Sequence, residues 1–403
     1  MRKYTSVLAA AGFAMLPLAS QAATPTLGDV LKASGITASG YVDFGTTVNN
    51  RGTDTNLPIG GAFTYGGIGG LQGAQDGSFR LNQVGLTVNT AISDSFSATL
   101  DVLAGMDAQA IVADGTGDIK FKQAYITYTN GNLTVLGGRF VTLAGSEVIN
   151  SSQNSNATRG LLFTFLQPTT HTGIRATYSI NKMVSLTGGV VNSALSTGTT
   201  FIVATLPGGA SALTSDNNTQ KTIEAQVAVN PFDGFSNALT FYRGIETTDN
   251  QNTTASPNDK AAPFLIDLVS SLQVTKALSL GLNYDYSKPM DAFFNSTFQG
   301  VALYGNFQVC NNLRLGGRGE YVTSVNSLGS FVATDSRLDA FEYTLTADYA
   351  VAKNFNVMTD VRFDKVNGPT AIGTIPAFAN GGKGFPDGGN ALTSLTVKAI
   401  YRF

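Results

Sequence analysis

Charged and amide side chains recur at every second position of several segments, with apolar side chains between them. Glu224 and Gln226, for example, alternate with Ile223 and Ala225. This period of two places polar and apolar residues on opposite faces of a β-strand. The polar face carries charges of both signs, which are too costly to leave unpaired in a dry interior, so it suits a wall that faces water. The residues predicted on this face are Asp43, Gln83, Asp101, Arg175, Glu224, Gln226, Asp267, Asn283, Asp285, Asn306, Arg314, Arg318, Glu320, Glu342, Asp348, Asp360, Arg362, Lys398 and Arg402.

Four arginines of this set are candidates for a basic wall. Arg314 and Arg318 lie four residues apart on one predicted strand, so they point the same way at a separation of about 13 Å. Arg175 and Arg362 could extend the same wall. In one interpretation the arginines pair with neighbouring acids and support the fold, and in the other they steer anions or sugars. Both interpretations stay open, because one residue of a pore wall can do both.

The connections between the alternating segments are short and long in turn. The short ones carry the Asn, Asp, Gly and Lys residues that tight hairpins need. With a last strand at 395–403, the pattern predicts an all-β fold, a closed transmembrane antiparallel β-barrel of about 16 strands with short periplasmic turns and long extracellular loops. The short connections lie at 91–95, 130–132, 181–182, 230–236, 275–277, 310–312 and 351–354, and the long ones at 49–78, 105–118, 141–170, 193–220, 246–262, 288–296, 323–338 and 366–391.

The amino terminus has the features of a secretory signal. Arg2 and Lys3 precede an apolar run at 7–18, and small residues up to Ala22 suit cleavage there. We therefore expect a signal peptide at 1–22, a short periplasmic helix or linker at 23–35 and the barrel at 36–403. Charged residues make up only 13% of the chain, which is too few for a solvated globule but suits a barrel in an outer membrane.

The same composition argues against several classes of partner and cofactor. The net charge of −2 gives no reason to expect nucleic acid as a partner. Cys310 and His171 are the single cysteine and the single histidine, so neither an internal disulfide nor a His/Cys metal site is expected. We expect no cofactor.

The third long connection, residues 141–170, has a mixed composition. Apolar residues such as Val148 and Ile149 stand beside a run rich in Asn, Ser and Thr, which is unusual for a loop in free water. We predict that this loop folds into the barrel and narrows it, with Glu147, Asn150 and Arg159 near the constriction. The alternative is an extracellular loop packed on its neighbours. The apolar run at 161–166 is either an extra strand or part of the folded loop.

Several motifs resemble the putative beta-barrel porin-2 (OmpL-like) family. They are LGDVL at 27–31 leading into SGYVD at 39–43, KQAY at 122–125, GGRFVTLAGSEVI at 137–149, NATRGLLF at 156–163 and THTGIRA at 170–176. The resemblance implies a porin of the bacterial outer membrane that lets small hydrophilic solutes diffuse passively. The pore-lining and constriction residues that we expect are Arg139, Glu147, Asn150, Arg159, Arg175, Arg314, Arg318, Glu320 and Arg362.

The resemblance also suggests partners. The terminal Phe403 resembles the signal that the outer-membrane barrel assembly machinery reads, so we expect it to serve insertion. The remaining partners are outer-membrane lipid and, because many porins of this size are trimers, further copies of the chain in a homotrimer.

Two other functions are compatible with a barrel. One is an outer-membrane enzyme in which His171 activates a serine, but Ser146, Ser151, Ser152 and Ser155 lack a diagnostic nucleophile motif, so we expect no enzyme. The other is a structural or adhesive barrel with a plugged lumen, which predicts a bulky apolar inner face. The polar inner face favours the porin.

Overall fold

The structure is a computed structural model of the whole chain. It describes residue 28 and residues 33–50, 77–111, 119–192, 221–244, 246–247, 260–261, 263–288, 297–324, 339–367 and 391–403. The expected signal peptide and most of the 23–35 segment lie outside these ranges. None of the described helices is long and apolar enough to cross a membrane.

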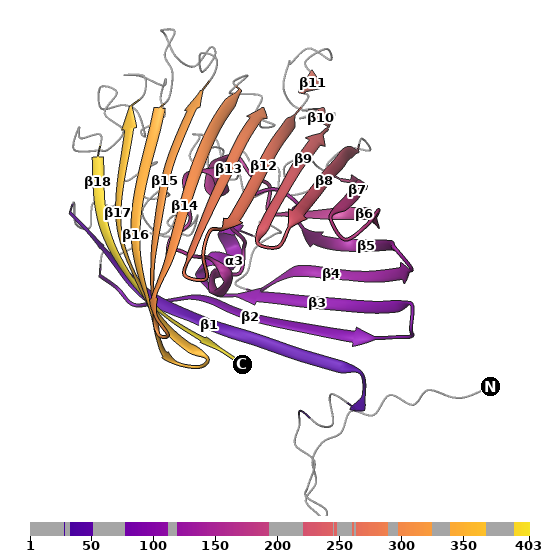
Figure 1. Cartoon of the computed structure of the whole chain (residues 1–403), viewed down its shortest axis with the longest axis horizontal. Coiled ribbons are helices and arrows are strands. Elements are labelled where there is room, and N and C mark those ends of the chain that lie inside the picture. The colour runs from indigo at the N-terminus through magenta and orange to yellow at the C-terminus, as the bar shows by residue number, and fades with distance from the viewer. Residues whose placement is uncertain are drawn as a thin grey trace, which may run out of the picture.

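Sixteen strands of the described residues form one closed antiparallel barrel. Each strand pairs with its neighbours along the chain, and the first strand pairs with the last, as Figure 1 shows where indigo β1 meets yellow β18. The predicted strand number and closure are confirmed. The strands are β1 (Ile36–Asn49), β2 (Arg80–Ala91), β3 (Phe96–Ala104), β4 (Ile119–Asn130), β5 (Leu133–Val141), β6 (Thr170–Ser179), β7 (Val184–Val191), β8 (Thr222–Phe232), β9 (Phe235–Arg243), β12 (Phe264–Gln273), β13 (Leu278–Lys288), β14 (Phe298–Cys310), β15 (Leu313–Ser324), β16 (Asp339–Ala352), β17 (Phe355–Asn367) and β18 (Ala391–Arg402).

A few short elements are not strands of the barrel wall. Two-residue strands β10 (Glu246–Thr247) and β11 (Lys260–Ala261) pair with each other in the connection from β9 to β12. The helix α3 (Met106–Ile111) follows β3, while the 3-10 helix η2 (Ser151–Gln153) and the helix α4 (Leu161–Phe165) lie between β5 and β6. The apolar run at 161–166 is therefore a helix within a loop, and the alternative of an extra strand is wrong.

The two faces of each strand differ as the period of two predicts. Along β16, Tyr343 and Leu345 are 56% and 72% exposed, whereas Glu342 and Thr344 are 0% and 1% exposed. The apolar outer face suits lipid, and the polar residues turn toward the lumen. The polar side chains that could contact a solute therefore lie on the inner face.

The seam of the barrel closes on the last residue. Gly40 and Phe403 exchange two backbone hydrogen bonds of 2.9 Å, which add to the ladder between β1 and β18. A Cβ at position 40 would lie 2.4 Å from the Phe403 ring, so the glycine leaves the space that this ring needs. The carboxyl-terminal aromatic residue is thus part of the closing strand pair.

The short connections all join adjacent strands, which confirms the predicted hairpins. In the turn from β4 to β5, Gly131 has φ +55°, a conformation that glycine adopts without strain. Most of the long connections lie wholly or largely outside the described residues. The exception is the connection of residues 142–169, hereafter the third loop, which is described along its whole length.

Candidate lumen constriction

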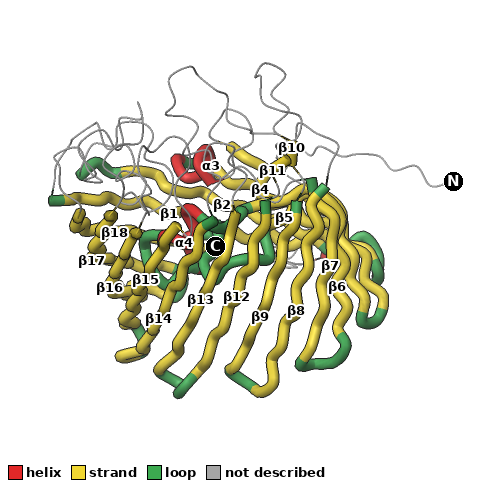
Figure 2. Tube along the Cα trace, turned by 90° about the horizontal axis from the view of Figure 1, so that it is seen from above, coloured by secondary structure: helices red, strands yellow, loops and turns green. Residues whose placement is uncertain are grey.

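The third loop lies inside the ring of strands, where Figure 2 shows α4 and its flanking loop segments. Its backbone bonds to inward-facing side chains on opposite sides of the barrel. Gly145 N–H donates to Asp267 of β12 at 2.9 Å, and Ser151 N–H donates to Gln83 of β2, eight strands away in the ring of sixteen, at 3.1 Å. A loop held to both walls crosses the lumen, as the sequence predicted.

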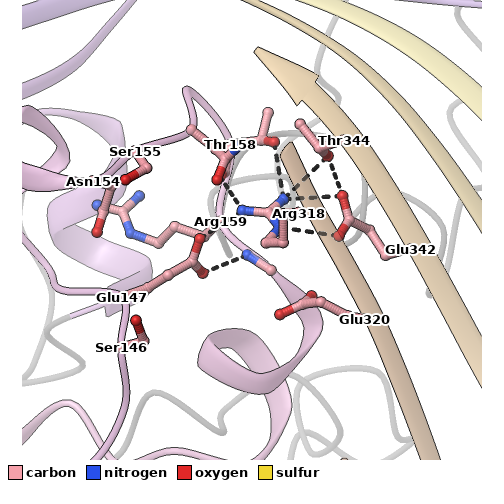
Figure 3. Close-up of polar contacts among 12 residues, drawn as sticks. Ser146, Glu147, Asn154, Ser155, Thr158, Arg159, Arg318, Glu320, Glu342 and Thr344 are labelled. Atoms are coloured by element: carbon pink, nitrogen blue, oxygen red, sulfur yellow. Dashed lines mark hydrogen bonds and ion pairs between the residues drawn. The ribbon is translucent and has the colours of Figure 1, made fainter. Parts of the chain in front are cut away.

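One ion-pair cluster holds the middle of the loop to the wall. Arg318 of β15 donates to Glu147 of the loop at 2.5 Å and makes a bidentate pair with Glu342 of β16, with both distances 3.0 Å. It also donates to the carbonyl of Thr158 at 2.7 Å. Figure 3 shows Arg318 between the loop and the strands. Because Arg318, Glu147 and Glu342 are all buried, each charge depends on the others.

The second oxygen of Glu147 closes the loop on itself. It accepts a hydrogen bond of 2.6 Å from the backbone N–H of Gly160, and the N–H of Leu161 binds Glu320 of β15. The loop therefore returns to the same strand that it reaches through Arg318. The predicted residues Glu147, Arg318 and Glu320 meet at one place.

The side chain of Arg159 attaches the third loop to α3. Its guanidinium pairs with Asp107 of α3 at 3.2 Å, donates to the carbonyl of Ile149 and lies 5.1 Å from the ring centre of Phe163. Burial raises the pKa of Asp107, and the charge of Arg159 opposes that shift. Gln83 of β2 completes the contact by donating to Asp107 at 2.9 Å.

The role of Asp107 was missed in the sequence. The connection after β3 was expected to be an extracellular loop, but its first residues form α3, whose Ala108 is fully buried against Leu103 and Ile149. Two inward segments, α3 and the third loop, therefore pack together. The signal in the sequence was weak, since an acidic residue followed by a small apolar one is common in surface helices.

Three more of the predicted arginines of the inner face are also paired. Arg175 makes a bidentate contact with Glu224 at 2.7 and 2.9 Å. Arg314 pairs with Asp348 at 2.8 Å. Arg362 pairs with Asp364 at 2.7 Å and donates to the carbonyl of Arg159 at 2.6 Å. These ion pairs agree with the interpretation of structural pairing, while Asp267 and Glu320 accept hydrogen bonds from backbone N–H groups of the third loop.

Asn150 lies in the third loop with a local role in its backbone, whereas Arg139 has a different position from that expected. Asn150 is the amino-terminal cap of η2, where its side-chain oxygen accepts from Ser152 N–H at 2.9 Å. Arg139 pairs with Ala124 and Thr172, on the same strand faces as outward-pointing Ile126 and Ile174. The register therefore places Arg139 on the outer face of the wall, which differs from the predicted pore-lining position.

An apolar contact fixes the return segment of the loop. Leu161, Leu162 and Leu166 are almost fully buried against Ala302 of β14 and Val322 of β15. The backbone of β14 approaches closely, since a Cβ on Gly300 would lie 2.9 Å from Leu162. This contact explains why an apolar run occurs in the middle of a polar loop.

A cavity of about 600 Å³ remains between the third loop and the wall on the side of the short turns. Most of its polar side chains are hydroxyls and amides. They come from the loop and from the facing strands: Ser146, Gln153, Asn154, Ser155, Asn156, Asn230, Ser236, Ser271, Gln273, Ser279 and Asn306.

His171 has a structural position in the inner wall. Its ring stacks on Tyr242 with ring centres 4.8 Å apart, and the Tyr242 hydroxyl accepts a hydrogen bond of 2.9 Å from Leu143 N–H. The histidine thus supports the start of the third loop.

Comparisons with known proteins agree with this architecture. The chain is similar to the solved outer membrane channel DcaP of Acinetobacter baumannii at 13% identity and a TM-score of 0.61, covering 91% of this chain and 97% of that one. It is similar to Pseudomonas putida OprB at 14% identity and a TM-score of 0.58, covering 93% and 96%. It is also similar to a trimer form of OmpT from Vibrio cholerae at 12% identity and a TM-score of 0.51, covering 91% and 99%.

These likenesses show the shared barrel fold. No curated protein sequence matches the chain significantly. The model of one family, described as putative beta-barrel porin-2, OmpL-like, matches residues 35–403. The chain therefore belongs to the putative beta-barrel porin-2, OmpL-like, family and is a porin of the outer membrane.

Proposed function

We propose that the third loop is the constriction of this porin, and that small hydrophilic solutes pass it by passive diffusion. The observation that carries the proposal is that one loop bonds to walls on opposite sides of the lumen, through Asp267 of β12 and Gln83 of β2. A solute that crosses the barrel must pass this loop. Its size limit then depends on the loop, and its charge preference on the side chains around it.

The chemistry of the lumen supports the diffusion of hydrated solutes. The cavity below the loop has room for on the order of twenty water molecules at about 30 Å³ each. Glu147 pairs with Arg318 and Asp107 pairs with Arg159, while Asp267 and Glu320 add acidic groups at the backbone of the loop. Selection by size is the main effect expected, and these acidic groups give no reason to expect a preference for anions.

A porin is expected to carry no enzymatic activity. The purified protein in planar lipid bilayers should give discrete current steps, and His171→Ala should keep them, because His171 stacks on Tyr242 in the wall. The porin proposal would be abandoned if no steps were seen while the protein showed hydrolytic activity that His171→Ala removed. A third outcome, no steps and no hydrolysis, would favour the structural barrel.

We also propose that Phe403 serves assembly of the barrel and that the functional form is a trimer, like the OmpT form described above. Deleting Phe403 is expected to reduce the amount of folded barrel in the outer membrane, because the closing pair with Gly40 loses its last two hydrogen bonds. Conductance per channel should stay the same, since the Phe403 ring is 56% exposed and lies outside the lumen contacts described above. Unchanged amounts of folded protein would contradict the assembly role.

A further inference from the structure

A row of cationic and aromatic residues lies at the rim of the outer wall. Arg243 ends β9, Phe264 begins β12 and Lys288 ends β13. The register pairs Phe264 with Arg243 on one side and with Lys288 on the other. The three residues therefore stand side by side on neighbouring strands, which Figure 1 shows in succession.

This row faces outward from the barrel. The residues next to it along the chain, Tyr242, Leu265 and Ser287, are all 0% exposed and turn to the lumen, so the alternation turns the row outward. Arg243 is exposed, and Phe264 and Lys288 are partly exposed. The next outward positions below the row are apolar or aromatic, namely Phe241, Ile266 and Tyr286.

The row stands at the end of the barrel where the long connections begin. The other ends of β12 and β13 are joined by the short turn at 274–277. In outer-membrane barrels the short turns are periplasmic and the long loops are extracellular. The row therefore lies at the level of the headgroups of the outer leaflet, with the apolar band of the wall below it.

Aromatic contacts position Arg243 and Phe264 of the row. The Arg243 guanidinium lies 6.0 Å from the centre of the Phe264 ring, and that ring lies 5.5 Å from the ring of Tyr286. Aromatic residues and long cationic side chains are the usual anchors at a membrane interface, with the charge directed to the headgroups. The arrangement suits a ligand that has both an apolar part and an anionic part.

The charges of the row are those that an anionic headgroup requires. The acidic residues of the same strands, Asp267 and Asp285, are fully buried on the lumen side and do not face it. Arg243 and Lys288 stand two strand spacings apart, about 10 Å. Arginine binds phosphate oxygens in a bidentate manner, and lysine binds them as a point charge.

We propose that Arg243, Phe264 and Lys288 form a binding site for the phosphorylated headgroup of an outer-leaflet lipid. Arg243 and Lys288 bind the phosphate oxygens, and the acyl chains lie along Phe241, Ile266 and Tyr286. The site is on the outside of the wall, so it is independent of solute passage through the lumen.

The test uses the full-length folded porin in detergent, with lipid A as the probe. Binding of phosphorylated and enzymatically dephosphorylated lipid A is measured by native mass spectrometry. The double variant R243Q/K288Q should bind the phosphorylated lipid roughly tenfold more weakly than wild type. The matched control K276Q/K353Q removes two exposed cations at short turns on the opposite rim and should bind like wild type.

Several outcomes would overturn the proposal. Equal affinity in wild type and R243Q/K288Q, or an equal loss in K276Q/K353Q, would show that these side chains do not form the site. If wild type bound phosphorylated and dephosphorylated lipid A equally well, a headgroup site would be excluded without any variant. Competition by inorganic phosphate as effective as lipid A itself would assign a free-anion site instead. The conductance of R243Q/K288Q should equal that of wild type. Because lipid binding and conductance are measured separately, failure of the porin proposal can be told apart from failure of the lipid site.

Discussion

Deleting residues 151–156 is expected to let larger solutes through the barrel and to raise the rate of passage of small ones by about twofold or more. This segment lies inside the barrel against β15, β16 and β18 and lines the cavity described above. It is held by Arg402 at the Ser152 carbonyl, by Arg314 at the Ser155 carbonyl at 3.1 Å, and by Asn156 at Thr346 at 2.6 Å. Its removal takes away side-chain volume and these attachments to the wall.

Swelling of liposomes with sugars of increasing mass measures this change directly. A matched control replaces residues 151–156 with a Gly/Ser segment of the same length, which keeps backbone in the lumen. This control should lie between the deletion and wild type. A deletion variant with the wild-type size limit would place the loop outside the solute path.

Arg318→Gln is expected to cause the largest loss of stability. The Arg318 guanidinium is buried and binds Glu147, Glu342 and the Thr158 carbonyl at once. Removing it leaves Glu147 without its cation and leaves Glu342 with only the longer contact to Arg362 at 3.7 Å. Breaking a buried pair in this way costs about 3–5 kcal/mol. The midpoint of heat-induced unfolding, followed by the change in gel migration of the barrel, should fall clearly.

Two variants separate this effect from a general loss of charge. Arg314→Gln breaks the pair with Asp348, whose side chains are 22% and 13% exposed, and the hydrogen bond to the Ser155 carbonyl. Because this site is more exposed than that of Arg318, the variant should cost less stability than Arg318→Gln. The triple variant E147Q/R318Q/E342Q removes all three charges and should recover most of the stability lost in R318Q. An equal midpoint for R318Q and R314Q would show that the buried cluster does not hold the loop.

Much of the fold could be predicted from the sequence, because it depends on local patterns. The alternation of residues such as Tyr343 and Thr344 determines which face is wet, and turn residues such as Gly131 separate the strands. Sixteen strands and the closing pair of β1 with β18 follow from counting these units. No long-range information was needed for this part.

The errors arose where the local pattern is absent or ambiguous. Arg139 follows Gly137 and Gly138, which have no side chains to show which face of the strand is polar. The run at 161–166 is apolar on all positions but one, so periodicity alone could not distinguish a strand from a buried helix. Packing against β14 and β15 in the folded barrel stabilises the helix.

The candidate site could be predicted only in part, since its contacts join distant segments. The sequence suggested Glu147, Arg159 and Arg318, but not which side chains each of them contacts. Arg318 meets Glu147 from a position 171 residues further along the chain, and Arg159 meets Asp107 across 52 residues. Such pairs depend on the closure of the barrel and on the path of the loop inside it. A short motif contains neither.

The most direct test of the account is the single-channel conductance of the variant that lacks residues 151–156, recorded beside wild type in the same lipid and salt. The account predicts discrete steps for both proteins and a clearly larger step for the deletion, because the segment occupies the lumen. Equal steps, with both barrels shown to be folded, would contradict the claim that the third loop limits passage through this porin.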